Sequence, residues 1–316
     1  MPSGHTQQDT EYGRPAGPRP LAPMPFDVEA TFPELTGTAR EVTLLYPRAG
    51  QPGPHDSSIG GPLLWPADEP WPMCTEADHY KPLAAPVGPE PVAMLPVLQL
   101  YARDVPGLVF PLGTDLLQIL WCPLVHHGGQ YAAKPRLHWR STVLTAEGAV
   151  AEDPPRPHTV EEDYLPRPCT VSPTPAVEYP NWDLPDELSE LLRERFEVME
   201  EERGYDYCEV ATTQQSKVGG YPGWTQPPDW PDCTGCGTHM DHLLSVTASE
   251  PGRGRWLPLD DRARQGGPAV PSWQAEADPD VLDVFGHGMD LGDLGGMYFF
   301  VCRACPDTPY THRYDC

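Results

Sequence analysis

Short apolar stretches separated by turn residues dominate the chain. Aliphatic, β-branched and aromatic residues gather in brief runs bounded by Gly and Pro, a pattern typical of β-strands. The runs that predict strands are 40–46, 94–101, 116–121, 136–140, 243–247, 255–257 and 297–301. Their number and spacing predict a predominantly β protein.

One segment has helical periodicity instead. Asp183 and the proline two residues later provide a capping side chain and an early proline, as at a helix N-terminus. The apolar residues that then share one helical face are Leu188, Leu191, Leu192, Phe196 and Met199. Gly204 follows them, and the opposite face is rich in glutamate. The sequence therefore predicts a helix within 181–206 with a solvated acidic face.

The first 36 residues have a different composition. They are polar and contain closely spaced prolines, and no apolar periodicity is visible in them. Such a segment lacks the apolar surface needed to offset the entropy of ordering. We expect residues 1–36 to be a disordered, Pro-rich segment.

An internal repeat is the most informative feature of the sequence. Residues 57–74 read SSIGGPLLWPADEPWPMC and align without a gap with residues 216–233, SKVGGYPGWTQPPDWPDC. The shared glycines and tryptophans are Gly60, Gly61, Trp65 and Trp71 in the first stretch and Gly219, Gly220, Trp224 and Trp230 in the second. Both stretches end in a cysteine, and the segments 116–122 and 297–302 are both predicted strands that end in a cysteine. Because Trp and Cys are rare, these matches predict two copies of one β-rich unit.

The paired glycines have a structural use in such a unit. Glycine adopts positive φ without strain and allows close approach of the backbone, here to the tryptophans that follow. We expect Trp65 and Trp224 each to pack over the Gly-Gly turn of its own copy. A phosphate-binding loop is disfavoured, because no Lys-Ser/Thr pair and no helix pattern follow the glycines.

These patterns predict an α+β, predominantly β fold: two divergent copies of one β-rich unit joined by a helix, with a zinc knuckle in the second copy. The predicted organisation is a disordered segment at 1–36, a first repeat at 37–180, a connecting helix at 181–206 and a second repeat at 207–316.

Charge and length narrow the classes of function. The 316 residues include 46 acidic and 21 basic side chains, which give a formal net charge of −25. A chain this acidic is repelled by phosphate backbones, which disfavours nucleic acid as a ligand. The same charge would attract a basic protein, because opposite fields speed encounter.

No apolar run approaches the ~20 residues of a membrane span, and the first residues do not resemble a signal peptide. We therefore expect no membrane association and a cytoplasmic protein. The oligomeric state is left open. In a reducing compartment, nine cysteines favour metal ligation over disulfides.

Two cysteine pairs in the second copy have metal-ligand spacing. Cys233 and Cys236 form one C-x-x-C pair, and Cys302 and Cys305 form another. Each such turn presents two thiolates at a separation that a tetrahedral zinc ion accepts, and each pair lies beside a predicted strand. Four thiolates close the site to water, so we expect a structural and not a catalytic zinc. A redox dithiol and unligated buried thiols are the alternatives.

The first copy has only the leading cysteine of each pair. After Cys74 and Cys122, the positions of the second thiols are occupied by Ala77 and Val125. This pattern predicts a decayed metal site whose core packs without metal. The alternative is that His79, His126 and His127 replace the missing thiols, and the sequence leaves a second metal open.

Another candidate lies beside the first cysteine pair of the second copy. His239 and His242 have H-x-x-H spacing and flank Asp241, which allows a weak metal or acid/base site. The remaining cysteines, Cys169, Cys208 and Cys316, belong to no pattern and are expected to be ordinary thiols.

The repeated motifs resemble two families. Ser57-Ser-Ile-Gly-Gly-Pro-Leu-Leu-Trp-Pro, Leu95-Pro-Val-Leu-Gln99 and Gly113-Thr-Asp-Leu-Leu-Gln-Ile-Leu120 resemble the bacterial YwqG-like family. The second copy, with Ser216-Lys-Val-Gly-Gly-Tyr-Pro-Gly-Trp224 and both cysteine pairs, is also similar to programmed cell death protein 2. The first resemblance implies a soluble β-rich fold of undefined activity. The second implies a dedicated chaperone of a small-subunit ribosomal protein.

The chain departs from these patterns at two positions. Ser58 replaces the usual lysine in the first copy, and Ser245 replaces the glutamine in the second. The resemblance covers residues 40–316 in patches and supports the fold and the zinc more than any partner.

Two classes of function follow. The first is a zinc-stabilised module that binds a protein client, as a chaperone or adaptor does. The second is an uncharacterised, hydrolase-like enzyme with a site between the two repeats. No G-x-S-x-G, H-E-x-x-H, P-loop or dinucleotide motif is present. The sequence therefore favours the binding module and assigns no catalytic residue.

Overall fold

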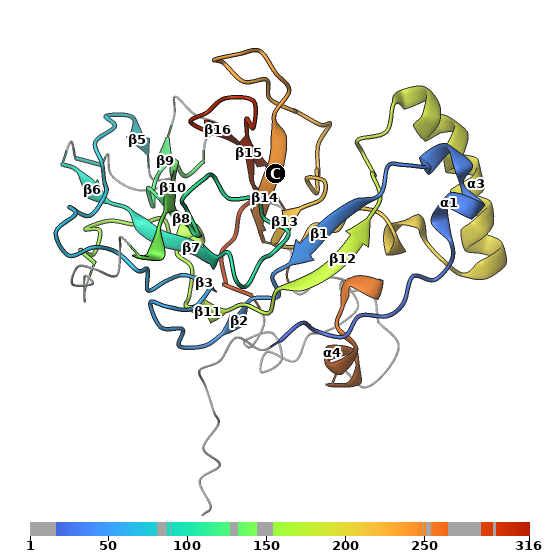
Figure 1. Ribbon diagram of the computed structural model, residues 1–316, viewed down its shortest axis with the longest axis horizontal. Coiled ribbons are helices and arrows are strands. Elements are labelled where there is room, and N and C mark those ends of the chain that lie inside the picture. Colours follow the sequence, from blue (N-terminus) through green and yellow to red (C-terminus); the bar gives the residue numbers. More distant parts are fainter. Residues whose placement is uncertain are drawn as a thin grey trace, which may run out of the picture.

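The computed structural model describes residues 17–80, 87–88, 90–126, 132–143, 154–248, 250, 254–264, 286–292 and 295–316. Within these residues the chain forms two six-stranded antiparallel sheets and two short two-stranded ladders (Figure 1). The fold is mainly β, as predicted. Helices lie at one end of the molecule and below the sheets in this view.

The sheet that contains most of the second half, here the C-terminal sheet, has its strands in the order β12 (Thr174–Glu178), β1 (Arg40–Leu44), β13 (Lys217–Gly219), β14 (Asp241–Thr247), β15 (Gly296–Val301) and β16 (Tyr310–Asp315). The N-terminal sheet has the order β10 (Pro135–Arg140), β8 (Leu116–Trp121), β7 (Leu95–Tyr101), β3 (Ser58–Ile59), β11 (Cys169–Thr170) and β2 (Arg48–Ala49). The short ladders pair β4 (Met73–Cys74) with β6 (Val92–Ala93), and β5 (His79–Tyr80) with β9 (Val125–His126).

The two sheets have the same arrangement of strands. Counted inward from β10 and from β16, each has an edge strand, two long antiparallel strands and then a short strand at whose end the Gly-Gly motif lies. The long pairs are β7–β8 and β14–β15, and each has one irregularity in its register. The extra residue is Val97 in one pair and Leu243 in the other, at the third position of the leading strand.

A two-stranded ribbon runs through both sheets. Within segments 40–49 and 169–178, residues 40–44 pair with 174–178 and residues 48–49 with 169–170, in the same antiparallel register. The β1–β12 part of the ribbon belongs to the C-terminal sheet and the β2–β11 part to the N-terminal sheet. The predicted first repeat, 37–180, thus includes two strands of the other sheet.

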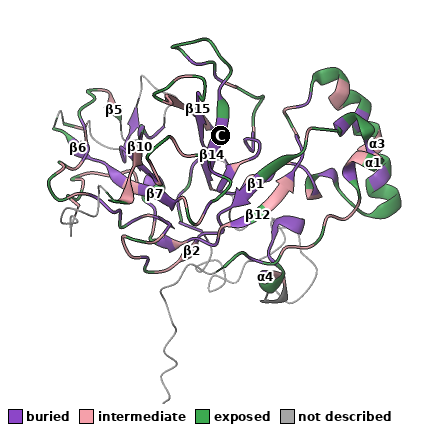
Figure 2. Cartoon of the chain, viewed as in Figure 1, coloured by how far each residue is buried: buried purple, intermediate pink, exposed green. Residues whose placement is uncertain are grey.

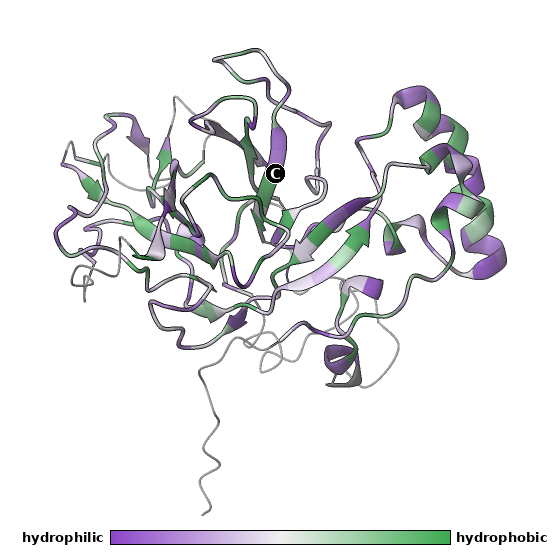
Figure 3. Cartoon of the chain, viewed as in Figure 1, coloured by the Kyte–Doolittle hydropathy of each residue, from purple (hydrophilic) through white to green (hydrophobic). Residues whose placement is uncertain are grey.

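The sheets bury one large common core. The six residues of β8 and the six of β15 are all buried. The largest apolar cluster combines side chains of both sheets, among them Leu98, Ile119, Leu244 and Phe299. The apolar positions follow the strands in Figure 3. Burial of each such side chain contributes about 1.5–3 kcal/mol, so the shared core opposes separation of the halves.

A second apolar cluster holds the N-terminal segment against the long helix. α1 (Val28–Thr31) and η1 (Pro33–Leu35) pack beside α3 (Asp186–Arg203) and η3 (Tyr207–Glu209) (Figure 1). Val28, Phe32 and Leu35 are buried, because their spacing places all three on one side of the turn. The prediction of disorder is therefore wrong for residues 28–35, whereas residues 1–16 lie outside the described residues.

Helix α3 is present where the periodicity predicts it. It ends at Arg203, and Gly204 takes the left-handed conformation, with φ 70°, that closes a helix. Two details of the prediction are wrong. The N-cap is Pro185 and not Asp183, whose carboxylate accepts hydrogen bonds from two tryptophans, and Leu191 is 57% exposed.

The other predicted strands form, with one exception. Residues 254–256 are a 3-10 turn, η4 (Gly254–Trp256), followed by α4 (Leu259–Arg264), and another 3-10 turn is η2 (Glu162–Tyr164). Trp256 packs against Val42, Leu44 and Tyr46 in a small apolar cluster. Among the described residues, no helix combines the length and the apolar character needed to cross a membrane.

Candidate metal centres

The Gly-Gly pairs set the path of the chain where it leaves each sheet. All four glycines have positive φ, between 67° and 80°, as the sequence predicts. A Cβ atom at Gly60 would lie 2.5 Å from the carbonyl oxygen of Arg167, and one at Gly220 would lie 2.2 Å from the Glu178 carboxylate. Glycine is required at these two positions because the backbone lies close to Arg167, just before the ribbon, and to Glu178 within it. The expected packing of Trp65 and Trp224 over these turns stays a prediction.

The tryptophans enclose the cysteines. Trp65 contacts Trp71, with ring centroids 5.2 Å apart, and Trp224 contacts Trp230 at 6.3 Å. The Trp65 cluster includes Cys74 and Cys122, and the Trp224 cluster includes Cys233 and Cys302. The repeated aromatic motif therefore forms the apolar wall beside a cysteine pair in each half.

A tight turn presents the first two thiols of the second half. The N–H of Gly237 donates to the carbonyl of Cys233 over 2.8 Å, and the N–H of Cys233 donates to the carbonyl of Thr238 over 2.8 Å. Gly237 has a φ of 72°, which the turn requires. These bonds bring Cys233 and Cys236 to one side of the loop.

The other two thiols follow the end of β15. Cys302 comes directly after Val301, and its N–H donates to the carbonyl of Pro309 over 2.9 Å. The N–H of Thr308 donates to the carbonyl of Cys305 over 3.1 Å, which closes the second turn. Neighbouring strands thus bring the two cysteine pairs together, although more than sixty residues separate them in sequence.

The four sulfur atoms have the spacing of a tetrahedral metal site. Sγ atoms of Cys233 and Cys305 are 3.9 Å apart, those of Cys236 and Cys302 are 3.5 Å apart, and all four lie within 4.8 Å of one another. Zinc–sulfur bonds of about 2.3 Å in a tetrahedron place the sulfurs about 3.8 Å apart. The cluster can hold a metal ion, and the predicted ligands are the residues brought together.

The thiols also differ in acidity before any metal binds. Hydrogen bonding with the side chain and backbone of Thr238 lowers the pKa of Cys236 to about 6. The neighbouring Cys236 raises the pKa of Cys305 to about 12, because two adjacent thiols do not ionise together easily. A divalent cation removes this conflict by neutralising adjacent thiolates.

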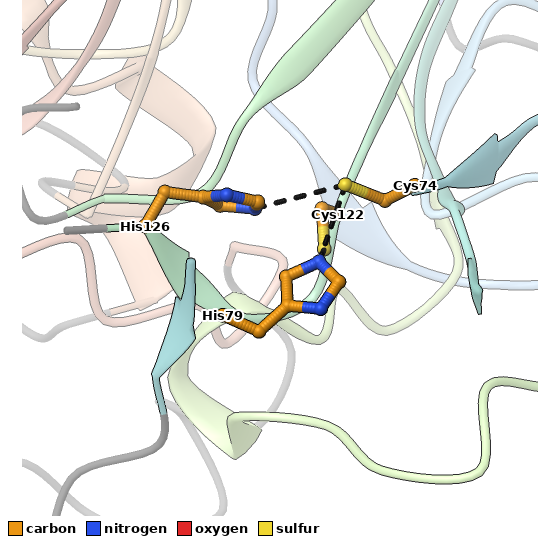
Figure 4. Close-up of side chains that lie close together, drawn as sticks. All are labelled: Cys74, His79, Cys122 and His126. Carbon is orange, nitrogen blue, oxygen red and sulfur yellow. Dashed lines mark hydrogen bonds between the residues drawn. The ribbon is translucent and has the colours of Figure 1, made fainter. Parts of the chain in front are cut away.

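The first half also contains four metal-ligating side chains close together (Figure 4). Cys74, His79, Cys122 and His126 each place one donor atom within 4.8 Å of the others. Two of the three histidines that the sequence offers as substitutes for the missing thiols, His79 and His126, are in position beside the two cysteines. The third, His127, lies outside the described residues.

The histidine-rich candidate of the second half does not converge on one point. His239 is exposed and its Nδ1 lies 3.3 Å from Asp232, whereas Asp241 pairs with Arg303 over 3.3 Å. His242 is buried between the Gly219 carbonyl and the Ser245 hydroxyl, and burial lowers its pKa to about 3. It is a neutral core histidine, so this trio offers no acid/base pair.

From the sequence, His79, His126 and His127 are all candidate substitutes for the missing thiols, and C-x-x-C spacing does not select among them. The available signal is that a histidine follows each lone cysteine, as C-x4-H after Cys74 and C-x3-H after Cys122. These spacings differ from C-x-x-C, because a histidine ligand tolerates a different loop length.

Comparison with protein-family models finds no match, and no curated protein matches the chain. The resemblances to the YwqG-like family and to programmed cell death protein 2 therefore stay predictions. The function is argued below from the residues of this chain.

Proposed function

We propose that the protein is a zinc-stabilised binding module that acts on a basic protein client, as a chaperone or adaptor does. The observation that carries the proposal is the large excess of acidic side chains, concentrated on helix α3. The closed sulfur cluster supports it, because a site of four thiolates leaves no position for a metal-bound water.

Helix α3 presents the acidic surface. It stands at one end of the molecule, and its outer side is exposed and hydrophilic (Figures 2 and 3). Its exposed acidic residues are Asp186, Glu187, Glu190, Glu194, Glu197, Glu200, Glu201 and Glu202, against exposed Arg193 and Arg203. Exposed Leu191 and Val198 lie one heptad apart among these carboxylates. A basic segment with a few apolar side chains complements such a surface in both charge and contact.

The metal in the four-cysteine cluster is zinc in this proposal. Thiolate sets select zinc, copper(I) or iron–sulfur clusters, and two C-x-x-C turns with tetrahedral spacing favour zinc. All nine cysteines are free thiols, which suits a reducing compartment.

The scaffold is, in the same proposal, a duplicated unit. Three hydrogen bonds donated by backbone N–H groups recur at aligned positions. The Pro72 and Pro231 carbonyls accept from the N–H groups of Met94 and Met240, both over 3.0 Å. In the second pair of bonds, the acceptors are the hydroxyls of Ser57 and Ser216. In the third pair, backbone carbonyls accept from the N–H groups of Cys122 and Cys302. Shared strand order, a shared bulge and shared hydrogen bonds support descent of both halves from one β-rich ancestor, with α3 in the connection.

Affinity capture with a matched pair of variants tests the proposal. One variant changes Glu194, Glu197 and Glu201 of α3 to glutamine. The control changes three exposed acidic residues elsewhere, Asp68 to asparagine, Glu90 to glutamine and Asp307 to asparagine, and so alters the net charge equally. Proteins captured by tagged wild type at low salt are identified by mass spectrometry, and the affinity of the purified client is then measured.

We expect a basic client whose capture the α3 variant loses and the control keeps. Binding should weaken as salt shortens the Debye length from about 10 Å at 0.1 M to about 3 Å at 1 M. A client without basic character, or one that the α3 variant still binds equally, contradicts the proposal.

A further inference from the structure

The first half contains a second, histidine-containing set of metal donors. We propose that Cys74, His79, Cys122 and His126 bind a second structural zinc ion, separate from the ion of the four-cysteine cluster. The chain then carries two zinc ions, one in each half.

The donor atoms point at one another (Figure 4). Nε2 of His79 lies 3.3 Å from the sulfur of Cys74 and 3.4 Å from that of Cys122, and Nε2 of His126 lies 3.8 Å from the sulfur of Cys74. Sulfur and nitrogen ligands of a tetrahedral zinc, at about 2.3 and 2.0 Å, are separated by about 3.5 Å. Both imidazoles therefore present the same ring nitrogen at ligand spacing.

Backbone pairing holds each donor in place. Cys74 lies on β4 opposite Val92, and the N–H of Cys122 donates to the carbonyl of Lys134 over 2.9 Å. His79 and His126 are direct cross-strand partners in the β5–β9 ladder. This two-residue ladder brings the two imidazoles to the cysteine pair.

A carboxylate orients one of the histidines. Asp78 Oδ1 lies 3.1 Å from Nδ1 of His126, on the side of the ring away from the cysteines. A carboxylate on the far nitrogen fixes the tautomer that leaves Nε2 free for a metal, as in many zinc sites. Cys74, Cys122 and His126 are each at most 3% exposed and His79 is half-buried, so three of the four donors lie in the interior.

The position of the set agrees with the four-cysteine cluster. Cys74 aligns with Cys233 in the repeated motif, and Cys122 follows β8 as Cys302 follows β15. The other two donors are histidines that come two residues later after Cys74 and one residue later after Cys122 than the corresponding thiols. Two ligands have kept their places, and two have been exchanged together with the loop that carries them.

An alternative use of three of these residues is nucleophilic catalysis. Cys74, His126 and Asp78 have the order of a thiol, an imidazole and a carboxylate, which occurs in cysteine hydrolases. Cys74 is 3% exposed, however, and the donor atoms of a second thiol and a second imidazole lie within 4.8 Å of its sulfur. A nucleophile needs access to its substrate, whereas a zinc ligand needs enclosure, so the geometry favours zinc.

Metal analysis and X-ray absorption of full-length protein, purified and then freed of loosely bound metal, test the proposal. Wild type should contain two zinc ions per chain with an average of three sulfur and one nitrogen ligand each. Cys122→Ser should contain one zinc with four sulfur ligands. Cys169→Ser is the matched control, because Cys169 is a buried thiol of the same half outside the cluster, and it should keep both ions.

The wild-type spectrum decides the question even where a variant fails to fold. One zinc per chain with only sulfur ligands overturns the second site. Rapid alkylation of Cys74 by iodoacetamide in native protein that retains its zinc would also overturn it, since a ligated, enclosed thiolate is protected. Slow alkylation of Cys74, accelerated when a chelator removes the metal, supports the site.

Discussion

The two halves have the same order of strands but different sets of metal donors at corresponding positions. In the second half, Cys233 ends the Trp motif and Cys302 follows β15. The other two donors, Cys236 and Cys305, lie on tight turns beside them. In the first half, the other two donors are His79 and His126, which lie on the short β5–β9 ladder. The second half has the two tight turns where the first half has this ladder. The comparison shows that the first cysteine of each pair keeps its aligned position in both halves, whereas the second ligand depends on the local loop.

The halves differ again beneath the Gly-Gly motif. Lys217 of β13 is fully buried and donates to both Glu178 carboxylate oxygens, at 3.0 and 2.9 Å, and to the Thr213 carbonyl. Burial alone would raise the pKa of Glu178 and lower that of Lys217, and their mutual attraction opposes both shifts. The aligned residue of the first half is Ser58, whose buried hydroxyl has no hydrogen-bond partner among the described residues. One half is tied to the ribbon by an ion pair, and the other only by packing and ladder bonds.

The largest effect is expected from the cysteine pair of the second half. Cys302→Ser should lose the metal of that half and lower the free energy of unfolding by more than about 4 kcal/mol, since zinc binding to such sites contributes on the order of 10 kcal/mol to folding. Elemental analysis and urea unfolding measure both quantities. Cys208→Ser, an exposed thiol outside both clusters, should change neither. Retention of the full zinc content in Cys302→Ser would refute the ligand assignment.

The buried ion pair should give the next largest effect. Lys217→Met leaves the Glu178 carboxylate buried without its counter-charge, which costs about 3–5 kcal/mol. The double variant Lys217→Met/Glu178→Gln removes the unpaired charge and should recover part of that loss. Denaturant unfolding of zinc-loaded protein gives both values. A loss below about 1 kcal/mol for the single variant would show that water reaches the pair.

Stability should also depend on pH through Glu250. Burial raises its pKa to about 7, from an ordinary value of 4.5. The folded state then holds this proton more tightly than the unfolded state, so the free energy of unfolding falls as pH rises from about 4.5 to 7. The full difference is about 3 kcal/mol at most.

Glu250→Gln should remove this fall and make the protein more stable than wild type at pH 8. The measured quantity is the difference between variant and wild type at each pH, in which the pH dependence of the metal sites cancels. The exposed Glu197→Gln should follow the wild-type curve. Parallel curves for Glu250→Gln and wild type would mean that Glu250 is hydrated in the folded protein.

The smallest effect is expected at Ser58, the residue of the first half that aligns with Lys217. Ser58→Ala should change the free energy of unfolding by less than about 1 kcal/mol, and in the stabilising direction, because the buried hydroxyl has no partner to lose. Thermal unfolding of the zinc-loaded protein detects such a shift. A loss above 1 kcal/mol would point to a buried water on Ser58.

Much of this arrangement could be predicted from the sequence, because it rests on local patterns. The Gly-Gly conformation, the strand ends at Cys122 and Cys302 and the end of α3 at Gly204 all follow from residues within a few positions. The four-cysteine cluster could be predicted because its ligands come in recognisable pairs.

The features that sequence reasoning missed depend on contacts between distant segments. Asp183 does not cap the helix, because its carboxylate accepts hydrogen bonds from Trp224 and Trp230. Phe32 is buried because its ring packs against Phe196 and Tyr207, and this contact orders the N-terminal segment. The sequence offers His79, His126 and His127 as candidate ligands, but only the β5–β9 pairing brings two of them together. Tertiary partners decided each of these cases against the local pattern.

The ribbon formed by residues 40–49 and 169–178 determines how the chain can be divided. A fragment that starts at residue 207 would lack β1 and β12, so β13 would become a bare edge, open to pairing with other chains, and Lys217 would be left without its carboxylate. Nor can the first half be released intact, since two of its segments are strands of the other sheet. The ribbon also closes only after a loop of more than a hundred residues, a contact order that slows folding. We therefore expect the two halves, although similar in strand order, to fold as one cooperative unit.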